Sequence, residues 1–402
     1  MIFLQRCSRR IIICGMNAEL DPKTVHIVND TDTLNECIEK LKKSREVAVD
    51  TESDSLFVYF EKVCLIQISA DGQSYVIDPL ETGDLSPLND IFSDPGVLKI
   101  FHAAEYDLMC LKRDFGFAFA NLFDTMIAAR MLGRKEIGLG SLLESEFDIH
   151  LDKHYQKANW GIRPLSREML NYAVSDTRFL SMLKDKLAAE LKNRDMEDIA
   201  QEDFDRLCQI HAAVSEPQEP VWWKVTGGVD LTPAEQGALQ GLCEFRDKEA
   251  QIRDLPPFKI LSNNALVDIA VENPANEKVL GKIKGVNGAV IRRYGKTILS
   301  INKAWRRKKN IPKPVFSARP CNGILSRRDR LKNWRKNLGI EMDVASDVIL
   351  PRDILETIAE VGPKDEAALK ELMSEVPARY RRFGKEILEV SLNESESESI
   401  EE

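Results

Sequence analysis

The sequence predicts an α/β domain with a mixed sheet, followed by two small all-α domains. Three observations predict this: β-rich runs give way to alternating helix and strand before residue 205, an internal repeat fills the C-terminal half, and positive charge is concentrated in one segment. The chain has 402 residues, 43% hydrophobic and 30% charged, as expected for a globular protein with a real core. No apolar stretch approaches the roughly 18 to 20 residues that a membrane-spanning helix needs.

Residues 24–205 carry the α/β pattern. Short β-rich runs lie close enough together for an antiparallel meander, at 46–51, 63–69 and 74–77. A further strand is expected at 97–102, and helical spacing follows at 104–115, 125–132, 139–147 and 166–191. Strands followed by alternating helix and strand favour an α/β domain with a mixed sheet.

The C-terminal half contains two copies of one unit. At an offset of 89 residues, 260–301 pairs without gaps with 349–390, and 15 of these 42 positions are identical. The apolar spacing is helical, and prolines and glycines separate short helices. We therefore expect helical domains at 228–302 and 329–392, with a linker at 206–227 and a basic linker at 303–328.

Positive charge is concentrated between residues 282 and 336. This segment holds 18 Lys or Arg residues and one acidic residue, although the whole chain has a net charge of −9. Its densest part is Arg306, Arg307, Lys308 and Lys309, with Trp305 and Trp334 nearby. Clustered cations beside aromatic rings favour phosphate contact and base stacking, so we expect these four residues to bind a nucleic acid. A solvated basic linker is the alternative.

The two ends of the chain and the cysteines predict the setting. Residues 1–23 are expected to form a poorly ordered leader without the features of a signal peptide, and Met16 is an alternative start. Residues 393–402 are expected to form an acidic, disordered tail. The eight cysteines lie far apart without a C-x-x-C pair, which favours a reducing, cytoplasmic location.

Acidic residues lie at the edges of the predicted elements. Asp50 and Glu52 are two apart on a strand and therefore share a face, and Asp107 opens a helix. Tyr172 and Asp176 lie one turn apart on another helix. Converging carboxylates suit Mg²⁺ or Mn²⁺, and two such ions can clamp a phosphodiester while the tyrosine positions or deprotonates the attacking water. Ordinary turn residues and surface neighbours are the alternatives.

With these residues assembled, the sequence resembles ribonuclease D, in the family of 3′–5′ exonucleases with four acidic metal ligands. Its motifs are 47–52 (VAVDTE), 101–108 (FHAAEYDL) and 172–176 (YAVSD), the last preceded by 160–165 (WGIRPL). The Tyr-x-x-x-Asp spacing is similar to the tyrosine branch of that family. The repeats resemble HRDC domains, helical modules that bind nucleic acids.

The resemblance implies a ribonuclease-H-like fold and metal-dependent hydrolysis that releases 5′-mononucleotides from RNA. It implies that Asp50, Glu52, Asp107 and Asp176 hold two Mg²⁺ or Mn²⁺ ions and that Tyr172 orients the water. The implied partner is RNA, especially tRNA precursors with 3′ extensions, and the implied state is a monomer that does not bind membranes. A DNA-directed exonuclease and an inactive RNA-binding scaffold are the alternatives.

Two details refine this expectation. Leu56 and Phe57, just after Glu52, could hold the 3′-terminal nucleotide, as in related exonucleases, or could serve only to pack the strand end. The second repeat has Glu371 and Glu375 where the first has Lys282 and Val286, so the two copies are not expected to bind RNA equally.

Overall fold

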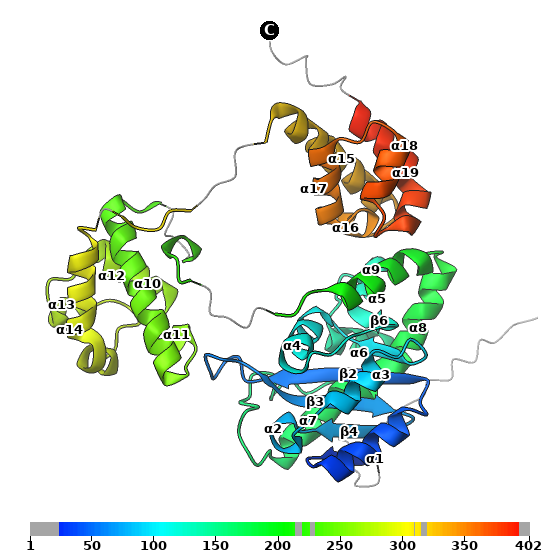
Figure 1. The fold of residues 1–402 in the computed structure, drawn as a ribbon, viewed down its shortest axis with the longest axis horizontal. Helices are drawn as coiled ribbons and strands as arrows, with labels where there is room; N and C mark the ends of the chain where they lie inside the picture. The colour runs from blue at the N-terminus through cyan, green and yellow to red at the C-terminus, as the bar shows by residue number, and fades with distance from the viewer. Residues whose placement is uncertain (1–23, 214–218, 226–229, 309, 315–319, 394–402) are drawn as a thin grey trace, which may run out of the picture.

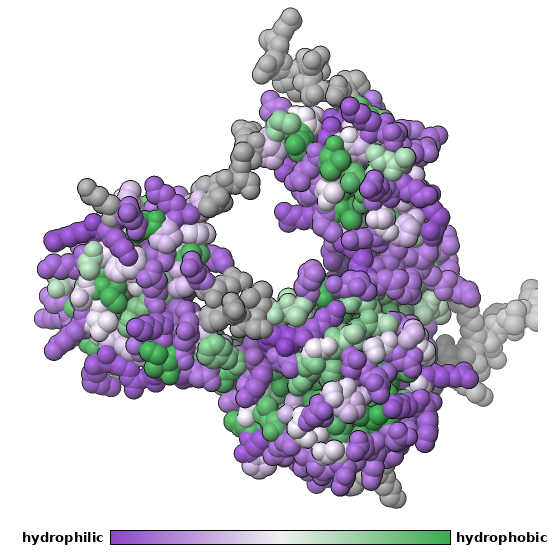
Figure 2. Space-filling model, in the orientation of Figure 1, coloured by the Kyte–Doolittle hydropathy of each residue, from purple (hydrophilic) through white to green (hydrophobic). Residues whose placement is uncertain are grey.

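The computed structural model describes residues 24–213, 219–225, 230–308, 310–314 and 320–393. The predicted leader, Lys309 and almost all of the predicted acidic tail lie outside the described residues. Three lobes surround an open space: an α/β domain, a first helical domain and a second helical domain (Figures 1 and 2). Among the helices described, none is long and apolar enough to cross a membrane.

The α/β domain is built on a six-stranded sheet with the order β1-β4-β3-β2-β5-β6. The strands are β1 (Val25–Val28), β2 (Glu46–Ser53), β3 (Val63–Ala70), β4 (Gln73–Ile77), β5 (Leu98–Phe101) and β6 (Leu122–Asp124). Strands β2, β3 and β4 form the predicted antiparallel meander. The pairs β1·β4, β2·β5 and β5·β6 are parallel, so the prediction of a mixed sheet is confirmed.

Helices surround this sheet. They are α1 (Thr31–Leu41), α2 (Pro79–Thr82), α3 (Asn89–Phe92), α4 (Glu105–Phe115), α5 (Thr125–Met131), α6 (Leu139–Phe147), α7 (Arg167–Arg178), α8 (Leu180–Asn193) and α9 (Glu197–Gln209). The helix predicted at 166–191 is broken at Phe179 into α7 and α8. Helix α9, which the sequence analysis did not predict, lies between the sheet and the second helical domain (Figure 1).

The central strand β2 explains how the sheet ends in a polar site. Val47 and Val49 enter the main core, and Ala48 lies in a separate small cluster with Ile100 and Leu180. The strand is therefore buried on both faces in its first half, as apolar residues in a central strand should be. From Asp50 onward its side chains are only half-buried. Because side chains alternate along a strand, Asp50 and Glu52 lie on the same face of the sheet as Ala48.

Both helical domains contain the same five helices. The first has α10 (Pro233–Arg253), α11 (Pro257–Ile260), α12 (Asn263–Glu272), α13 (Glu277–Leu280) and α14 (Gly288–Trp305). The second has α15 (Asn322–Glu341), α16 (Ser346–Ile349), α17 (Arg352–Val361), α18 (Glu366–Leu372) and α19 (Pro377–Leu392). Each helix of the second domain begins 89 residues after its counterpart, so the repeat in sequence is a repeat in structure.

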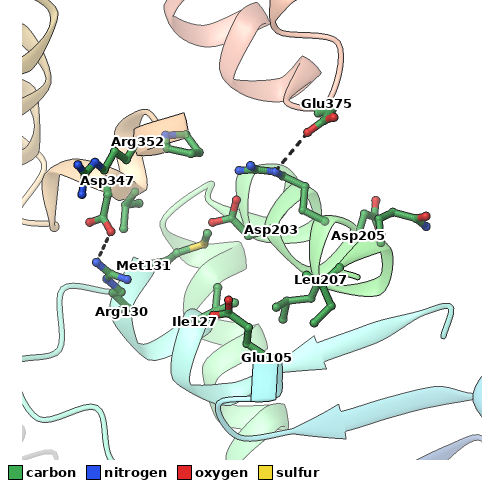
Figure 3. A pocket seen from close by; sticks show the side chains of 15 residues that line it. Glu105, Ile127, Arg130, Met131, Asp203, Asp205, Leu207, Asp347, Arg352 and Glu375 are labelled. Carbon is green, nitrogen blue, oxygen red and sulfur yellow. Dashed lines mark hydrogen bonds and ion pairs between the residues drawn. The ribbon is translucent and has the colours of Figure 1, made fainter. Parts of the chain in front are cut away.

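The helical domains contact the α/β domain differently. The first reaches the loop between β2 and β3, where the Tyr59 hydroxyl donates to Asp247 at 2.7 Å. The second packs on α9 and α5 and encloses with them a cleft of about 640 Å³, crossed by ion pairs of Arg130 with Asp347 and Arg206 with Glu375 (Figure 3). This cleft does not include the predicted catalytic residues.

Candidate active site

Three predicted metal ligands meet at the polar end of β2. Asp50 and Glu52 come from the strand and Asp176 from α7, and carboxylate oxygens of all three lie within 4.8 Å of one another. Helix α7 packs against β2, β3 and β4, which brings Asp176 to the strand although the two elements are far apart in the sequence. All three side chains are half-buried.

The crowded carboxylates hold protons strongly. Burial, followed by the neighbouring negative charges, raises the pKa of Glu52 to about 9 and that of Asp50 well above its ordinary value. Burial also raises the pKa of Asp176 to about 7. Removing water from an anion is costly unless a cation compensates, so these carboxylates need a positive partner in order to ionise fully.

Asp107 lies beside this group rather than within it. Its carboxylate accepts a hydrogen bond from the Thr51 hydroxyl, and burial raises its pKa to about 7. The turn before α4 is held by Asp124, a buried residue that the sequence analysis missed. Its two carboxylate oxygens accept from the backbone of Ala104 at 2.7 Å and of Met126 at 2.8 Å. Asp124 thereby fixes the start of the helix that carries Asp107.

Tyr172 faces the same group from α7. Burial, followed by the negative charges of the nearby carboxylates with Asp176 first, raises the pKa of its phenol. The centroid of its ring lies 5.9 Å from the ring centroid of the fully buried Trp160. The segment after Trp160 is held by Arg163, which donates to Asp78 at 2.7 Å. The 160–165 motif is therefore a support for the tyrosine.

A cavity of about 380 Å³ opens over these side chains. Asp50, Glu52, Tyr172 and Asp176 line it, as does Lys153. Lys153 is exposed and comes from the loop after α6, and the sequence analysis did not single it out. An exposed ammonium beside a carboxylate cluster can contact a phosphate of a bound substrate.

The other predicted binding residues lie elsewhere. Leu56 is 41% exposed. The Lys259 ammonium of the first helical domain lies over the ring of Phe57, 4.2 Å from the ring centroid. Neither Leu56 nor Phe57 lines the cavity. At the end of α14, Arg306 donates to the carbonyl of Ala270.

The neighbours of Arg306 are placed differently. Arg307 is exposed, and the Lys308 ammonium lies 3.4 Å from the Trp305 ring centroid. These residues are remote in sequence and absent from the lining of the cavity, so they would belong to a separate contact with a polymer.

The donor set at β2 and α7 fits a hard divalent cation. All ligands are carboxylate oxygens, which Mg²⁺ and Mn²⁺ prefer over nitrogen or sulfur. One oxygen from each of the three carboxyl groups lies within 4.8 Å of the others, and the pKa values of the Glu52 and Asp176 carboxyl groups are raised. A bound cation would stabilise this arrangement in its ionised form.

Fold and site together define a 3′–5′ exonuclease. Residues 25–192 match the family model described as 3'-5' exonuclease, and residues 235–301 and 325–390 each match the HRDC domain model. The ribonuclease D of Zymomonas mobilis is 32% identical over 269 residues, which cover 65% of this chain and 68% of that protein. The chain belongs to the ribonuclease D family, whose exonuclease domain uses divalent metal ions.

Two further similarities agree with this assignment. The ribonuclease D of Sphingobium indicum is 29% identical over 372 residues, which cover 90% of this chain and 94% of that one. The crystal structure of the catalytic core of RRP6 from Trypanosoma brucei matches with a TM-score of 0.62 and 26% identity, over 70% of this chain and 79% of that one. The prediction of an enzyme with a ribonuclease D fold is therefore confirmed.

Proposed function

We propose that this protein is a metal-dependent 3′–5′ exoribonuclease that removes 5′-mononucleotides one at a time, with the 3′ ends of tRNA precursors and other small RNAs as substrates. The observation that carries the proposal is the group of Asp50, Glu52 and Asp176, whose oxygens lie within 4.8 Å of one another in a cavity next to Tyr172. The names of the relatives favour RNA over DNA.

The chain's own residues would position the reacting groups. Asp50, Glu52, Asp107 and Asp176 would hold two divalent cations, which when bound supply Lewis-acid activation and neutralise developing charge. Burial is the main cause of the raised pKa of Tyr172, so the phenol stays protonated at neutral pH. It therefore orients the attacking water by a hydrogen bond and does not act as a base. Lys153 would contact a phosphate oxygen of the substrate.

The reaction balances without any further reactant. Water attacks the phosphorus of the last phosphodiester, and the bond from phosphorus to the 3′ oxygen of the preceding nucleotide breaks. A proton passes to that oxygen, which leaves a shortened RNA with a 3′ hydroxyl and a nucleoside 5′-monophosphate. Leu56 and Phe57 lie in the turn that follows β2 and do not line the cavity, so they would contact the terminal nucleotide only where it extends beyond the cavity.

The test is a time course on a 5′-labelled RNA with a single-stranded 3′ extension beyond a stable stem. Mg²⁺ and Mn²⁺ are compared with EDTA, and a DNA of the same sequence is run alongside. A ladder that shortens by single nucleotides, depends on metal and forms faster on RNA is the expected result. Faster shortening of DNA would move the protein to the DNA-directed alternative, and binding without shortening would make it a scaffold.

A further inference from the structure

The two helical domains carry one polar face in duplicate. Its sequence is Arg-Arg-aromatic-Gly-Lys, at 292–296 in α14 and at 381–385 in α19. We call the side chains of Arg292, Arg293 and Lys296 the α14 face. Those of Arg381, Arg382 and Lys385, with Arg379 one turn earlier, form the α19 face. The two helices start 89 residues apart and occupy the same place in each domain, so the two faces are structurally equivalent.

The arginines of the α19 face contact the α/β domain, whereas Lys385 is exposed. Arg379 has no exposed surface and donates to Asp203 at 2.8 and 2.9 Å and to Glu202 at 3.1 Å. Arg382 donates to Asp198 at 2.6 Å. All three acids belong to α9. In the second helical domain this face therefore binds an anionic partner, and that partner is the enzyme's own acidic helix.

The α14 face is open. Arg292, Arg293 and Lys296 are exposed, and among the described residues no carboxylate lies within ion-pair distance of any of them. Val290 occupies the place of Arg379, so the arginine that anchors the second domain on α9 is absent from the first. The α14 face has the chemistry of its counterpart without that partner.

The surroundings of the α14 face are also more basic. Lys282 and Lys284 precede α14 and are exposed. Their counterparts in the second domain are Glu371 and Met373. These five exposed cations have no ion pair with an acid in the part of the chain that the structure describes. They are suited to a row of phosphates, because a guanidinium can hold a phosphate through two hydrogen bonds and an ammonium can attract one as a point charge.

We propose that the α14 face, extended by Lys282 and Lys284, binds the phosphate backbone of the substrate RNA, and that the α19 face is a structural dock that does not touch it. The first helical domain would thus bind the substrate, and the second would dock on the α/β domain. This inference rests on the proposed function for the identity of the polyanion as RNA.

The test uses the full chain with matched charge reversals in the two domains. The test variant is R292E/R293E/K296E. The control is K364E/K370E/K385E, which changes the charge by the same amount at exposed positions of the second domain, and in which Lys385 is the counterpart of Lys296. Binding of a fluorescein-labelled 24-nucleotide single-stranded RNA is followed by anisotropy in EDTA, from low to high salt, after circular dichroism has established that both variants are folded.

The test variant should raise the Kd about tenfold or more at low salt. Loss of three phosphate contacts should lower the slope of log Kd against log salt by about 2, since each contact to a single strand contributes about 0.7. The control should stay within about twofold of the unmodified protein in both quantities. A test variant with unchanged Kd and slope, as expected if the face bound an acidic protein, overturns the proposal, and so does a control that weakens binding equally.

Hydrolysis of a four-nucleotide RNA in Mg²⁺ separates this inference from the proposed function. Unmodified protein that binds RNA but hydrolyses none refutes the proposed function while the binding comparison stands. Protein that hydrolyses RNA normally, with RNA binding unaffected by R292E/R293E/K296E, refutes only the inference.

Discussion

Removal of Arg379 should release the second helical domain from α9. This guanidinium is fully buried and donates to Asp203, to Glu202 and, at 3.0 Å, to the carbonyl of Val348. Glu202 is itself only 6% exposed, so Arg379→Ala leaves a buried carboxylate without its cation. Breaking a buried ion pair by removing one partner costs about 3 to 5 kcal/mol. We expect docking of the second domain to weaken by that amount.

The loss should depend on pH. Burial already raises the pKa of Glu202 with Arg379 in place, and without the arginine it rises further. A carboxyl group whose pKa is higher in the folded state than in the unfolded state stabilises the fold at low pH, and this contribution is lost as the pH rises through the folded pKa. Protonated Glu202 also needs no cation. The variant should therefore be more strongly destabilised at pH 8 than at pH 5.

Hydrogen exchange of peptides from α9 and α19 measures the opening of this interface directly. Arg381→Ala is the matched control, because Arg381 is 62% exposed and its nearest carboxylate oxygen, on Asp198, lies 3.5 Å away. That variant should cost well under about 1 kcal/mol. A cost below about 1 kcal/mol for Arg379→Ala at pH 8, or an equal cost at both pH values, would refute the reasoning.

Three further predictions concern the active site and its surroundings. Asp176→Asn should abolish turnover and leave RNA binding in EDTA nearly intact; retention of more than about a tenth of the activity would remove Asp176 from the metal site. Mg²⁺ should raise the melting temperature more at pH 8 than at pH 5.5. The raised pKa values of Glu52 and Asp176 make the metal-free site less stable as the pH rises, and protons compete with the metal at low pH. Equal increases in melting temperature at the two pH values would contradict this. Tyr59→Phe removes the 2.7 Å hydrogen bond to Asp247, a loss of about 0.5 to 1.5 kcal/mol. Hydrogen exchange in the β2–β3 loop should therefore rise. Unchanged exchange would show that this contact does not restrain the loop.

Local patterns in the sequence predicted most of the fold. Strands β2, β3 and β4 and helices α4, α5 and α6 lie close to the predicted positions because their periodicity is expressed within a few residues. Strands β1 and β6, of 4 and 3 residues, were missed, whereas β5, also of 4 residues, was predicted from the longer run at 97–102. The break at Phe179 was also missed, because apolar spacing continues through it into α8.

The site divides in the same way. Asp50 and Glu52 could be paired from the sequence because a strand has a period of two. Thr51, Lys153 and the contact of Arg163 with Asp78 depend on chain segments that meet only in the folded state. Asp124 was within reach, because an Asp directly before a predicted helix is a recognised N-cap signal, and it does cap α5.

The basic segment shows why a count of charges cannot locate a binding surface. Its arginines in α15 are engaged inside the second helical domain: Arg327 donates to the carbonyl of Ala359, and Arg335 to that of Leu350. These bonds satisfy backbone carbonyls at the ends of short helices. The two guanidinium groups therefore stabilise the domain and are not available to bind a ligand. The exposed cations that remain lie mainly before and within α14. Charge that is one cluster in sequence is therefore divided by folding into a structural part in α15 and an exposed part that lies mainly before, within and just after α14.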